Sequence, residues 1–351
     1  MIDNQSAYKG AIILLSDYLE LKAGERLYVI LDRRYQSFYG ESVCYLEEAA
    51  RRLGGKISVV EDKRIDDHPG CDFRDWYQDL EADVYLFAGR AKSHRKREGL
   101  AIAKEGARVF RSFDFGVDLL ESAFQTPKKV LVSLNDWLIS KGEISSKAFI
   151  RSSDGTDLQI DFDSKFPWTD SHGTGSGQFP GVFPPGEVST LPANVNGVVV
   201  ASGALNSSVS IPCSPIIDSY GLTLEFRNSW CHTWRAESTL LQQTLDALFT
   251  VDNARRIGEF GIGTNLGVTR FVPFLSHINE RKPGPHIGMG TPTQLPGTTS
   301  WSSLVHLDVI VPGASVWFDD QLVYDGSEFV EPLISNAAMP AKRNRLLVDA
   351  L

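Results

Sequence analysis

The chain has 351 residues and a formal net charge of -9 at pH 7, with 44 Asp and Glu against 35 Lys and Arg. Its 42% of hydrophobic and 23% of charged residues are ordinary for a globular protein and exclude an intrinsically disordered chain. The negative charge opposes binding to nucleic-acid phosphates or anionic lipid, so we expect neither nucleic acid nor a membrane as a partner.

Two domains are expected, because the chain exceeds the length at which a single hydrophobic core usually stops growing. Residues 1–143 alternate helix-like and strand-like segments, which predicts a Rossmann-like α/β domain with a parallel sheet. The predicted helices are residues 4–21 and 40–53, and the predicted strands are residues 26–31, 56–61, 83–88, 108–111 and 129–133.

A nucleotide cofactor is not expected in this first domain. The Gly-rich turn of a dinucleotide site should follow the first strand, where the sequence instead reads Asp32-Arg-Arg-Tyr-Gln-Ser-Phe-Tyr, with Gly40 the only glycine in reach. We therefore interpret residues 1–143 as a scaffold and a surface for dimer formation.

Residues 144–351 are predicted to form a β-rich α+β domain that binds metal. Short alternating strands are expected at residues 148–151, 157–162, 197–201, 208–211, 222–226, 304–311 and 315–318, with a helix between 236 and 249. Residues 165–185 contain four Gly and four Pro, so we predict no long regular element there. A loop of this length inside a compact domain indicates a lid or a binding loop.

A cytoplasmic location is the expectation from the cysteines and the N-terminus. Four cysteines occur singly, without the spacing of a zinc knuckle or the density of a disulfide framework, and are interpreted as reduced. The N-terminal segment lacks the basic region and cleavage site of a signal peptide, and no apolar run approaches the roughly 20 residues that span a bilayer.

Five side chains of metal-ligating type have glycine, proline or strand residues as neighbours, the settings that place side chains at strand ends. They are Glu187, Glu259, His286, His306 and Asp308. The last two are separated by one residue, so in a strand both point to the same face and can converge on one ion. Taken alone, an H-x-D in a strand is explained equally well by a satisfied His and a solvated Asp.

The motifs around these residues resemble those of the thermophilic aminopeptidase T family of metallopeptidases, the AmpS type included. The resemblance rests on P-G-E-V-x-T, G-E-x-G-I-G-T-N, H-I-x-x-G and H-x-D, which occur in that order over about residues 180–325. The N-terminal half is similar to this family only in its alternation of helices and strands and in the short segment before its first predicted strand.

The resemblance implies a dinuclear metal site held by Glu187, Glu259, His286, His306 and Asp308. This mixed oxygen and nitrogen set suits zinc, cobalt or manganese, and it lacks the sulfur of a typical structural zinc. The implied activity is hydrolysis of a peptide or amide bond in a small, amino-acid-like substrate or short peptide. Glu187 and Glu259 are the catalytic candidates, one of them doubling as general base. A homodimer is implied as well.

The sequence departs from the family at one position that matters for catalysis. The peptidases carry a Tyr seven residues after the histidine that matches His286, and this chain has Thr293 there. A lost hydrogen bond to the developing oxyanion costs on the order of 3 kcal/mol, so the substitution bears directly on peptidase activity.

Two alternatives remain open from the sequence. The dihydroxypyridine dioxygenases, which the chain resembles more distantly, hold one Fe(II) on two histidines and a carboxylate, and His286, His306 and Asp308 can form such a set. Those enzymes have histidine at the position of Glu259 and apolar residues at those of Glu187 and His286, which favours the hydrolase. The third alternative is a catalytically silent relative that binds a peptide or partner protein.

Overall fold

The computed structural model describes residues 4–32, 36–62, 81–89, 106–113, 115–174, 181–217, 221–273, 277–294 and 297–330. The chain divides into two compact units: unit 1 comprises Met1–Lys128 and Ser171–Pro185, and unit 2 comprises Lys129–Asp170 and Gly186–Asp349. The expected domain boundary between residues 143 and 144 stays a prediction. No helix in the described ranges is both long and apolar enough to span a membrane.

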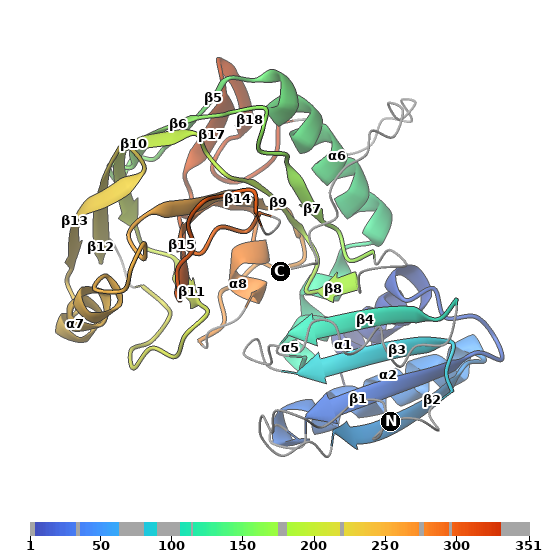
Figure 1. Cartoon of the computed structure of the whole chain (residues 1–351). Helices are drawn as coiled ribbons and strands as arrows, with labels where there is room; N and C mark the ends of the chain where they lie inside the picture. The colour runs from blue at the N-terminus through green and yellow to red at the C-terminus, as the bar shows by residue number, and fades with distance from the viewer. Residues whose placement is uncertain are drawn as a thin grey trace. The chain divides into compact units, whose positions relative to one another are not determined.

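Unit 1 contains a five-stranded sheet in the order β2-β1-β3-β4-β8, and each neighbouring pair of strands is parallel. The strands β2, β1, β3 and β4 lie side by side in Figure 1. Their bounds are β1 (Arg26–Asp32), β2 (Lys56–Asp62), β3 (Val84–Gly89), β4 (Arg108–Phe113) and β8 (Gly181–Phe183). The helical segments are α1 (Gln5–Ile13), η1 (Leu14–Tyr18), α2 (Gln36–Leu53), α5 (Val117–Glu121) and η3 (Ala123–Gln125). The chain is therefore of the α/β class, and the first four strands expected in this half are confirmed.

Phe183 anchors the last strand of this sheet through an aromatic cluster. Its ring lies 5.4 Å from that of Phe110, 5.2 Å from that of Phe124 and 5.8 Å from that of Tyr18, measured between centroids. All four side chains are buried. Offset and edge-to-face aromatic pairs of this kind stabilise a core beyond their apolar area. The chain is thus fixed in unit 1 four residues before Glu187.

The fifth strand expected in the first half, residues 129–133, is wrong. These residues lie in helix α6 (Lys128–Ile144). Leu131, Leu134 and Leu138 are buried, and their spacing of three and four residues forms one apolar stripe of a helix. The β-branched residues of 129–133 favour a strand only when this segment is considered alone, because so short a segment cannot show the helical spacing of apolar residues.

Unit 2 contains a seven-stranded sheet in the order β13-β12-β10-β6-β5-β17-β18, with antiparallel neighbours. The bounds are β5 (Lys147–Arg151), β6 (Asp157–Asp161), β10 (Asn194–Ala201), β12 (Leu222–Arg227), β13 (Trp230–Ala236), β17 (Ser315–Phe318) and β18 (Gln321–Tyr324). The expected strands at 148–151, 157–162, 197–201, 222–226 and 315–318 are confirmed. Helix α7 (Thr239–Leu248) confirms the helix expected between 236 and 249.

A second, six-stranded sheet runs in the order β11-β16-β15-β14-β9-β7. Its strands are β7 (Thr169–Ser171), β9 (Glu187–Thr190), β11 (Ala204–Ser207), β14 (Ile257–Gly263), β15 (Gly284–Gly290) and β16 (His306–Ile310). The short helix α8 (Ile278–Arg281) lies between β14 and β15 in the chain. The strand expected at 304–311 is confirmed in β16. The strand expected at 208–211 is wrong, because the pairing with β16 is made by Ala204–Ser207 instead.

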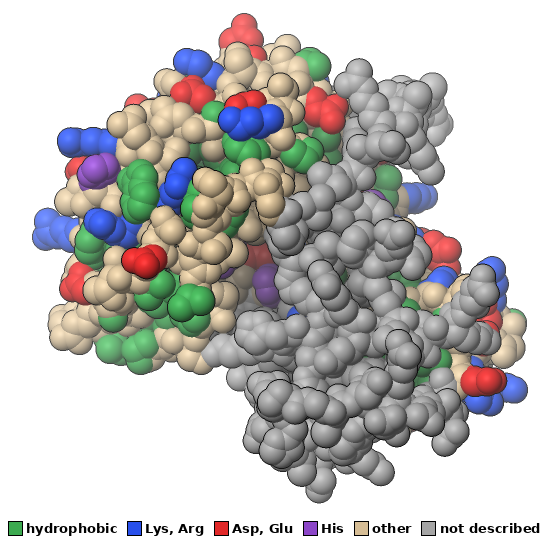
Figure 2. All heavy atoms as spheres, in the orientation of Figure 1, with side chains coloured by type: hydrophobic (Ala, Val, Ile, Leu, Met, Phe, Trp, Pro, Cys, Tyr) green, Lys and Arg blue, Asp and Glu red, His purple; other side chains and the backbone are tan. Residues whose placement is uncertain are grey.

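The two sheets of unit 2 share one hydrophobic core. Phe260, Ile287 and Leu307 of the six-stranded sheet belong to the same buried cluster as Ile150 and Leu158 of the seven-stranded sheet. Burial of one face leaves the alternate residues of β14, β15 and β16 on the opposite face. On the described part of the surface seen in Figure 2, acidic and basic side chains are interspersed.

Candidate metal centre

The strand register of the six-stranded sheet brings the five candidate ligands to one face. Glu259 of β14 pairs with Gly288 of β15, which pairs in turn with Asp308 of β16. His286 pairs with Gly261, two residues along β14, and Glu187 of β9 pairs with Gly263, two residues further. Residues two apart in a strand share a face, and His306 is two residues from Asp308. The alignment of four neighbouring strands therefore brings the candidate ligands together.

Glycines in this register leave the space that the ligand side chains occupy. A Cβ added at Gly261 would lie 2.1 Å from Nε2 of His286. A Cβ added at Gly288 would lie 2.8 Å from Oδ1 of Asp308 and 2.8 Å from Cβ of Glu259. Since real Cβ atoms do not approach other atoms this closely, any larger residue at either position would displace a ligand.

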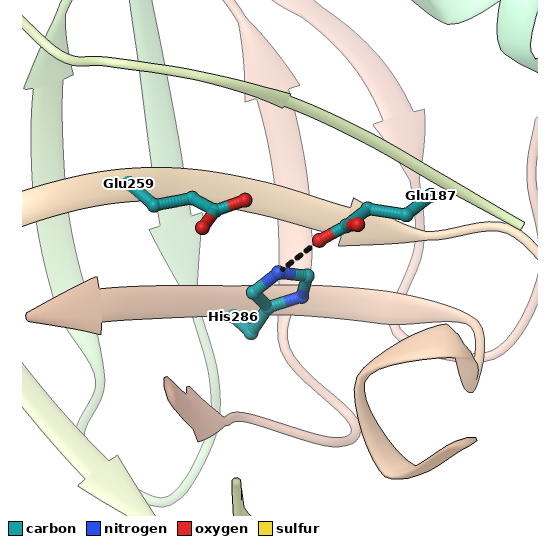
Figure 3. Close-up of side chains that lie close together, drawn as sticks. All are labelled: Glu187, Glu259 and His286. Atoms are coloured by element: carbon teal, nitrogen blue, oxygen red, sulfur yellow. Dashed lines mark hydrogen bonds and ion pairs between the residues drawn. The ribbon is translucent and has the colours of Figure 1, made fainter. Parts of the chain in front are cut away.

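The first group of side chains that can hold an ion consists of Glu187, Glu259 and His286, all buried. Oε1 of Glu187 lies 2.9 Å from Nε2 of His286. In Figure 3 the carboxyl groups of Glu187 and Glu259 extend toward one another beside the His286 imidazole. These side chains come from β9, β14 and β15, so three adjacent strands supply one candidate ligand each.

The second group consists of Glu259, His306 and Asp308. Nδ1 of His306 lies 2.7 Å from the carbonyl oxygen of Thr291, which can only accept a hydrogen bond, so Nδ1 carries the donated proton. Nε2 of His306 then faces Oδ1 of Asp308 at 2.9 Å and Oε2 of Glu259 at 3.4 Å. In each group one donor atom per residue lies within 4.8 Å of the others, and Glu259 belongs to both.

Two further polar side chains hold the outer oxygens of the Glu187 and Asp308 carboxylates. Arg281 forms an ion pair with Oε2 of Glu187, and Nδ2 of Asn206 lies 3.3 Å from Oδ2 of Asp308. Both also contact Glu280: Asn206 Nδ2 donates to its Oε2 at 2.6 Å, and Arg281 lies 3.1 Å from its Oε1. Sequence reasoning did not identify these residues. No local motif marks Asn206, Glu280 or Arg281 in the sequence.

Burial and the neighbouring charges shift the proton affinities of the cluster. Burial lowers the pKa of His286, but the hydrogen bond and charge of Glu187 outweigh it and raise that pKa to about 9. The pKa of His306 is likewise raised well above its usual value, because Asp308 and Glu259 outweigh burial. Burial, together with the charges of Glu280 and Glu259, raises the pKa of Asp308 to about 7. The folded cluster therefore binds protons tightly when no other cation is present.

Glu259 and Glu280 shift the other way. Burial raises the pKa of Glu259, but the hydrogen bond and charge of His306 outweigh it, so the pKa lies below its ordinary value. Burial also raises the pKa of Glu280, and the charges of His277 and Arg281 bring it well below the ordinary range. Both carboxylates are therefore ionised at neutral pH.

The donor set fits a divalent cation. With its proton on Nδ1, His306 presents an acceptor nitrogen to Oδ1 of Asp308, which is buried and has no hydrogen bond within the described structure. Two acceptor atoms in contact require a cation between them, either a proton or a metal. Carboxylate oxygens and imidazole nitrogens without sulfur are ligands for zinc, cobalt, manganese or iron. The buried groupings of Glu187, Glu259, His286, His306 and Asp308 can thus bind metal.

Thr293 lies shortly after β15, at the position where the aminopeptidase pattern has tyrosine. Its hydroxyl oxygen is buried and has no hydrogen-bond partner among the residues that the structure describes. A threonine side chain is much shorter than a tyrosine and cannot carry a hydroxyl to the same point in space.

Comparison with known proteins supports a relationship at the level of the fold. No family model and no curated protein matches the sequence. AmpT from Thermus thermophilus is 17% identical, with a TM-score of 0.62 over 93% of this chain and 99% of that one. The 2,5-dihydroxypyridine dioxygenase from Pseudomonas putida KT2440 is 16% identical, with a TM-score of 0.57 over 93% of this chain and 97% of that one.

The chain shares their fold. At these identities the likeness does not assign it to the family of either protein, and fold alone does not fix function. What decides between the two kinds of chemistry is the set of residues in the site.

Proposed function

We propose that the chain is a metal-dependent hydrolase of aminopeptidase type, which cleaves an amide or peptide bond of a small amino-acid-like substrate at a dinuclear site. The observation that carries this proposal is the division of the five ligands into two overlapping groups joined by Glu259. His286 and His306 fall in different groups, which favours two ions over the single ion of a two-histidine, one-carboxylate site. The fold shared with AmpT from Thermus thermophilus is consistent with it.

The residues of the chain have separate roles in this proposal. Glu187, Glu259, His286, His306 and Asp308 would hold two ions of zinc, cobalt or manganese, and Glu259 belongs to both side-chain groups. When bound, such ions supply Lewis-acid activation of water and of the scissile carbonyl. Glu187 or Glu259 accepts the proton of the attacking water. The Nδ1 hydrogen bond of His306 to Thr291 keeps Nε2 directed at the site.

The proposal also covers the parts of the chain outside the five candidate ligands. We propose that the parallel-sheet unit is a Rossmann-like scaffold without a nucleotide site, and that the chain acts in the cytoplasm as a homodimer. Thr293 in place of tyrosine removes an oxyanion donor worth on the order of 3 kcal/mol, so we expect slow cleavage of ordinary peptides and a specialised amide as the true substrate.

The test is hydrolysis of a panel of aminoacyl amides and aminoacyl anilides by protein reconstituted with cobalt, zinc or manganese. We expect activity with at least one ion, and its loss in both His306→Ala and Asp308→Ala. Oxygen uptake with 2,5-dihydroxypyridine and Fe(II), without hydrolysis, would replace the proposal by the dioxygenase alternative, which rests on the shared fold.

A further inference from the structure

Two candidate ligands, one in each group, have the same arrangement of their carboxylate oxygens. Glu187 directs Oε1 to His286 at 2.9 Å, while its Oε2 is paired with Arg281. Asp308 directs Oδ1 to His306 at 2.9 Å, while its Oδ2 accepts a hydrogen bond from Asn206. In both cases an outer group holds one oxygen and leaves the other directed at an imidazole.

The two outer groups meet on one carboxylate. Arg281 lies 3.1 Å from Oε1 of Glu280, and Asn206 donates to Oε2 of Glu280 at 2.6 Å. His277 contacts the same Oε1 through its Nδ1 at 2.7 Å. Glu280 is only 4% exposed, so both of its oxygens are committed to protein partners in a buried setting. A chain of contacts therefore runs from Glu187 through Arg281, Glu280 and Asn206 to Asp308.

The backbone that carries Glu280 is fixed against the six-stranded sheet. The side chain of Asn279 accepts a hydrogen bond from the backbone nitrogen of Val272 at 2.8 Å and donates one to its carbonyl at 3.1 Å. The carbonyl of Arg281 accepts from the backbone nitrogen of Asn265 at 3.0 Å. A Cβ at Gly263 would lie 2.1 Å from the carbonyl oxygen of Lys282, so a glycine in β14 permits this close approach. A side chain held this way transmits a fixed geometry to its partners.

We propose that Glu280 is a positioning residue that orients Glu187 through Arg281 and Asp308 through Asn206, so that each presents one oxygen to the metal site. The inference rests on the proposed function, because it assumes that Glu187 and Asp308 are ligands. Glu259 has no part in this chain of contacts, which leaves its carboxylate to the two ligand groups that it joins. Glu280 itself is not a ligand, since its two oxygens are turned to Arg281, His277 and Asn206.

The experiment is a titration of metal-free protein with Co²⁺, followed by calorimetry and by the visible absorption of the bound ion. Glu280→Gln keeps the shape of the side chain but replaces one acceptor oxygen with a donor, so Arg281 and Asn206 cannot both be held. We expect both binding steps to weaken by about 10- to 100-fold, with an altered spectrum. Asn206→Ala removes the hydrogen bonds to Asp308 and to Oε2 of Glu280 but keeps Arg281 paired with Glu187 and with Oε1 of Glu280, so we expect one of the two steps to weaken and the other to keep its affinity.

The matched control is Glu225→Gln in β12, where the carboxylate accepts a hydrogen bond from Thr233. This variant should bind Co²⁺ as the wild type does. Circular dichroism verifies folding, and if Glu280→Gln does not fold, the selective effect of Asn206→Ala decides. Wild-type affinities and spectra in Glu280→Gln and Asn206→Ala would overturn the positioning role and leave the proposed function standing. A wild-type protein that takes up no Co²⁺ would overturn both.

Discussion

Gly288 is a residue at which added volume would contact three of the candidate ligands at once. It pairs with Glu259 of β14 and Asp308 of β16, and an added Cβ would lie 3.0 Å from Cε1 of His306 in addition to the contacts described above. We predict that Gly288→Ala folds but binds divalent metal about 10- to 100-fold more weakly, because three ligands must shift. Calorimetric titration with Zn²⁺ measures this loss.

Gly40 provides the matched control, since nothing lies within 4 Å of a Cβ added there. Gly40→Ala lies in helix α2, where alanine stabilises the helix by up to about 1 kcal/mol, and it should leave metal affinity unchanged. Equal metal affinity in Gly288→Ala and Gly40→Ala would contradict the placement of the ligands.

The stability of the metal-free protein should depend on pH through His286 and Asp308. The pKa of each is raised on folding, to about 9 for His286 and about 7 for Asp308, so the folded state binds protons more tightly than the unfolded state. The stability this contributes is fully present below the unfolded pKa values and is lost as pH rises through the folded ones. We predict that Tm in the presence of a chelator falls between about pH 6.5 and pH 9.

Thermal denaturation at a series of pH values, with and without Zn²⁺, measures this dependence. Metal replaces the protons, so the loaded protein should lose less stability over the same interval, and metal affinity should rise with pH. His286→Gln should flatten the metal-free curve at its alkaline end. A metal-free Tm that rises from pH 6.5 to pH 9 would be the opposite of this prediction.

At the scale of the element, the two faces of strand β14 have different roles: one carries a candidate metal ligand and the other packs in the hydrophobic core. Glu259 and Gly261 lie on the face of the ligands, whereas Phe260 is fully buried in the core shared by the two sheets of unit 2. Truncation of a buried phenylalanine removes apolar contacts and leaves a cavity. We predict that Phe260→Ala lowers the free energy of unfolding by about 3–5 kcal/mol while the folded variant keeps its metal stoichiometry.

Chemical denaturation monitored by circular dichroism gives the free energy of unfolding. Leu304→Ala is the control, because Leu304 is 85% exposed and its truncation should change stability by less than about 0.5 kcal/mol. A Phe260→Ala variant as stable as the control would show that this face of β14 does not support the fold.

The sequence predicted most strands and helices because their hydrophobic periods are long enough to recognise. Residues 129–133 were predicted as a strand because Val130, Leu131 and Val132 were judged without the helical stripe that continues through Leu134 and Leu138. A strand was predicted at residues 208–211, whereas the strand in the structure is β11 (Ala204–Ser207). Which residues pair with β16 depends on the alignment of the two strands in the folded sheet, which the local sequence does not specify.

The five candidate ligands stand out because glycine, proline or strand residues flank them, and the resemblance to the aminopeptidase T family is what implies that they form one metal-binding set. Asn206, Glu280 and Arg281 could not, since their role depends on distances between segments far apart in the chain. Buried ion pairs and hydrogen bonds of this kind have no periodic signature in a sequence. The sequence therefore indicates the candidate ligands and not the contacts around them.

At the scale of the whole molecule, the shared fold leaves two chemistries open. AmpT and the 2,5-dihydroxypyridine dioxygenase have similar TM-scores to this chain, 0.62 and 0.57, and neither exceeds 17% identity. The difference between a hydrolase and an oxygenase must therefore lie in the metal and its ligands. The pairing of Glu187 with His286 and of His306 with Asp308, with Glu259 common to both groups, favours two ions.

The most direct test of this account is the metal content of the purified protein, measured by elemental analysis after anaerobic purification and reconstitution. The account predicts about two equivalents of zinc, cobalt or manganese per chain, falling in the His306→Ala and Asp308→Ala variants. One equivalent of iron, or no tightly bound metal, would contradict it.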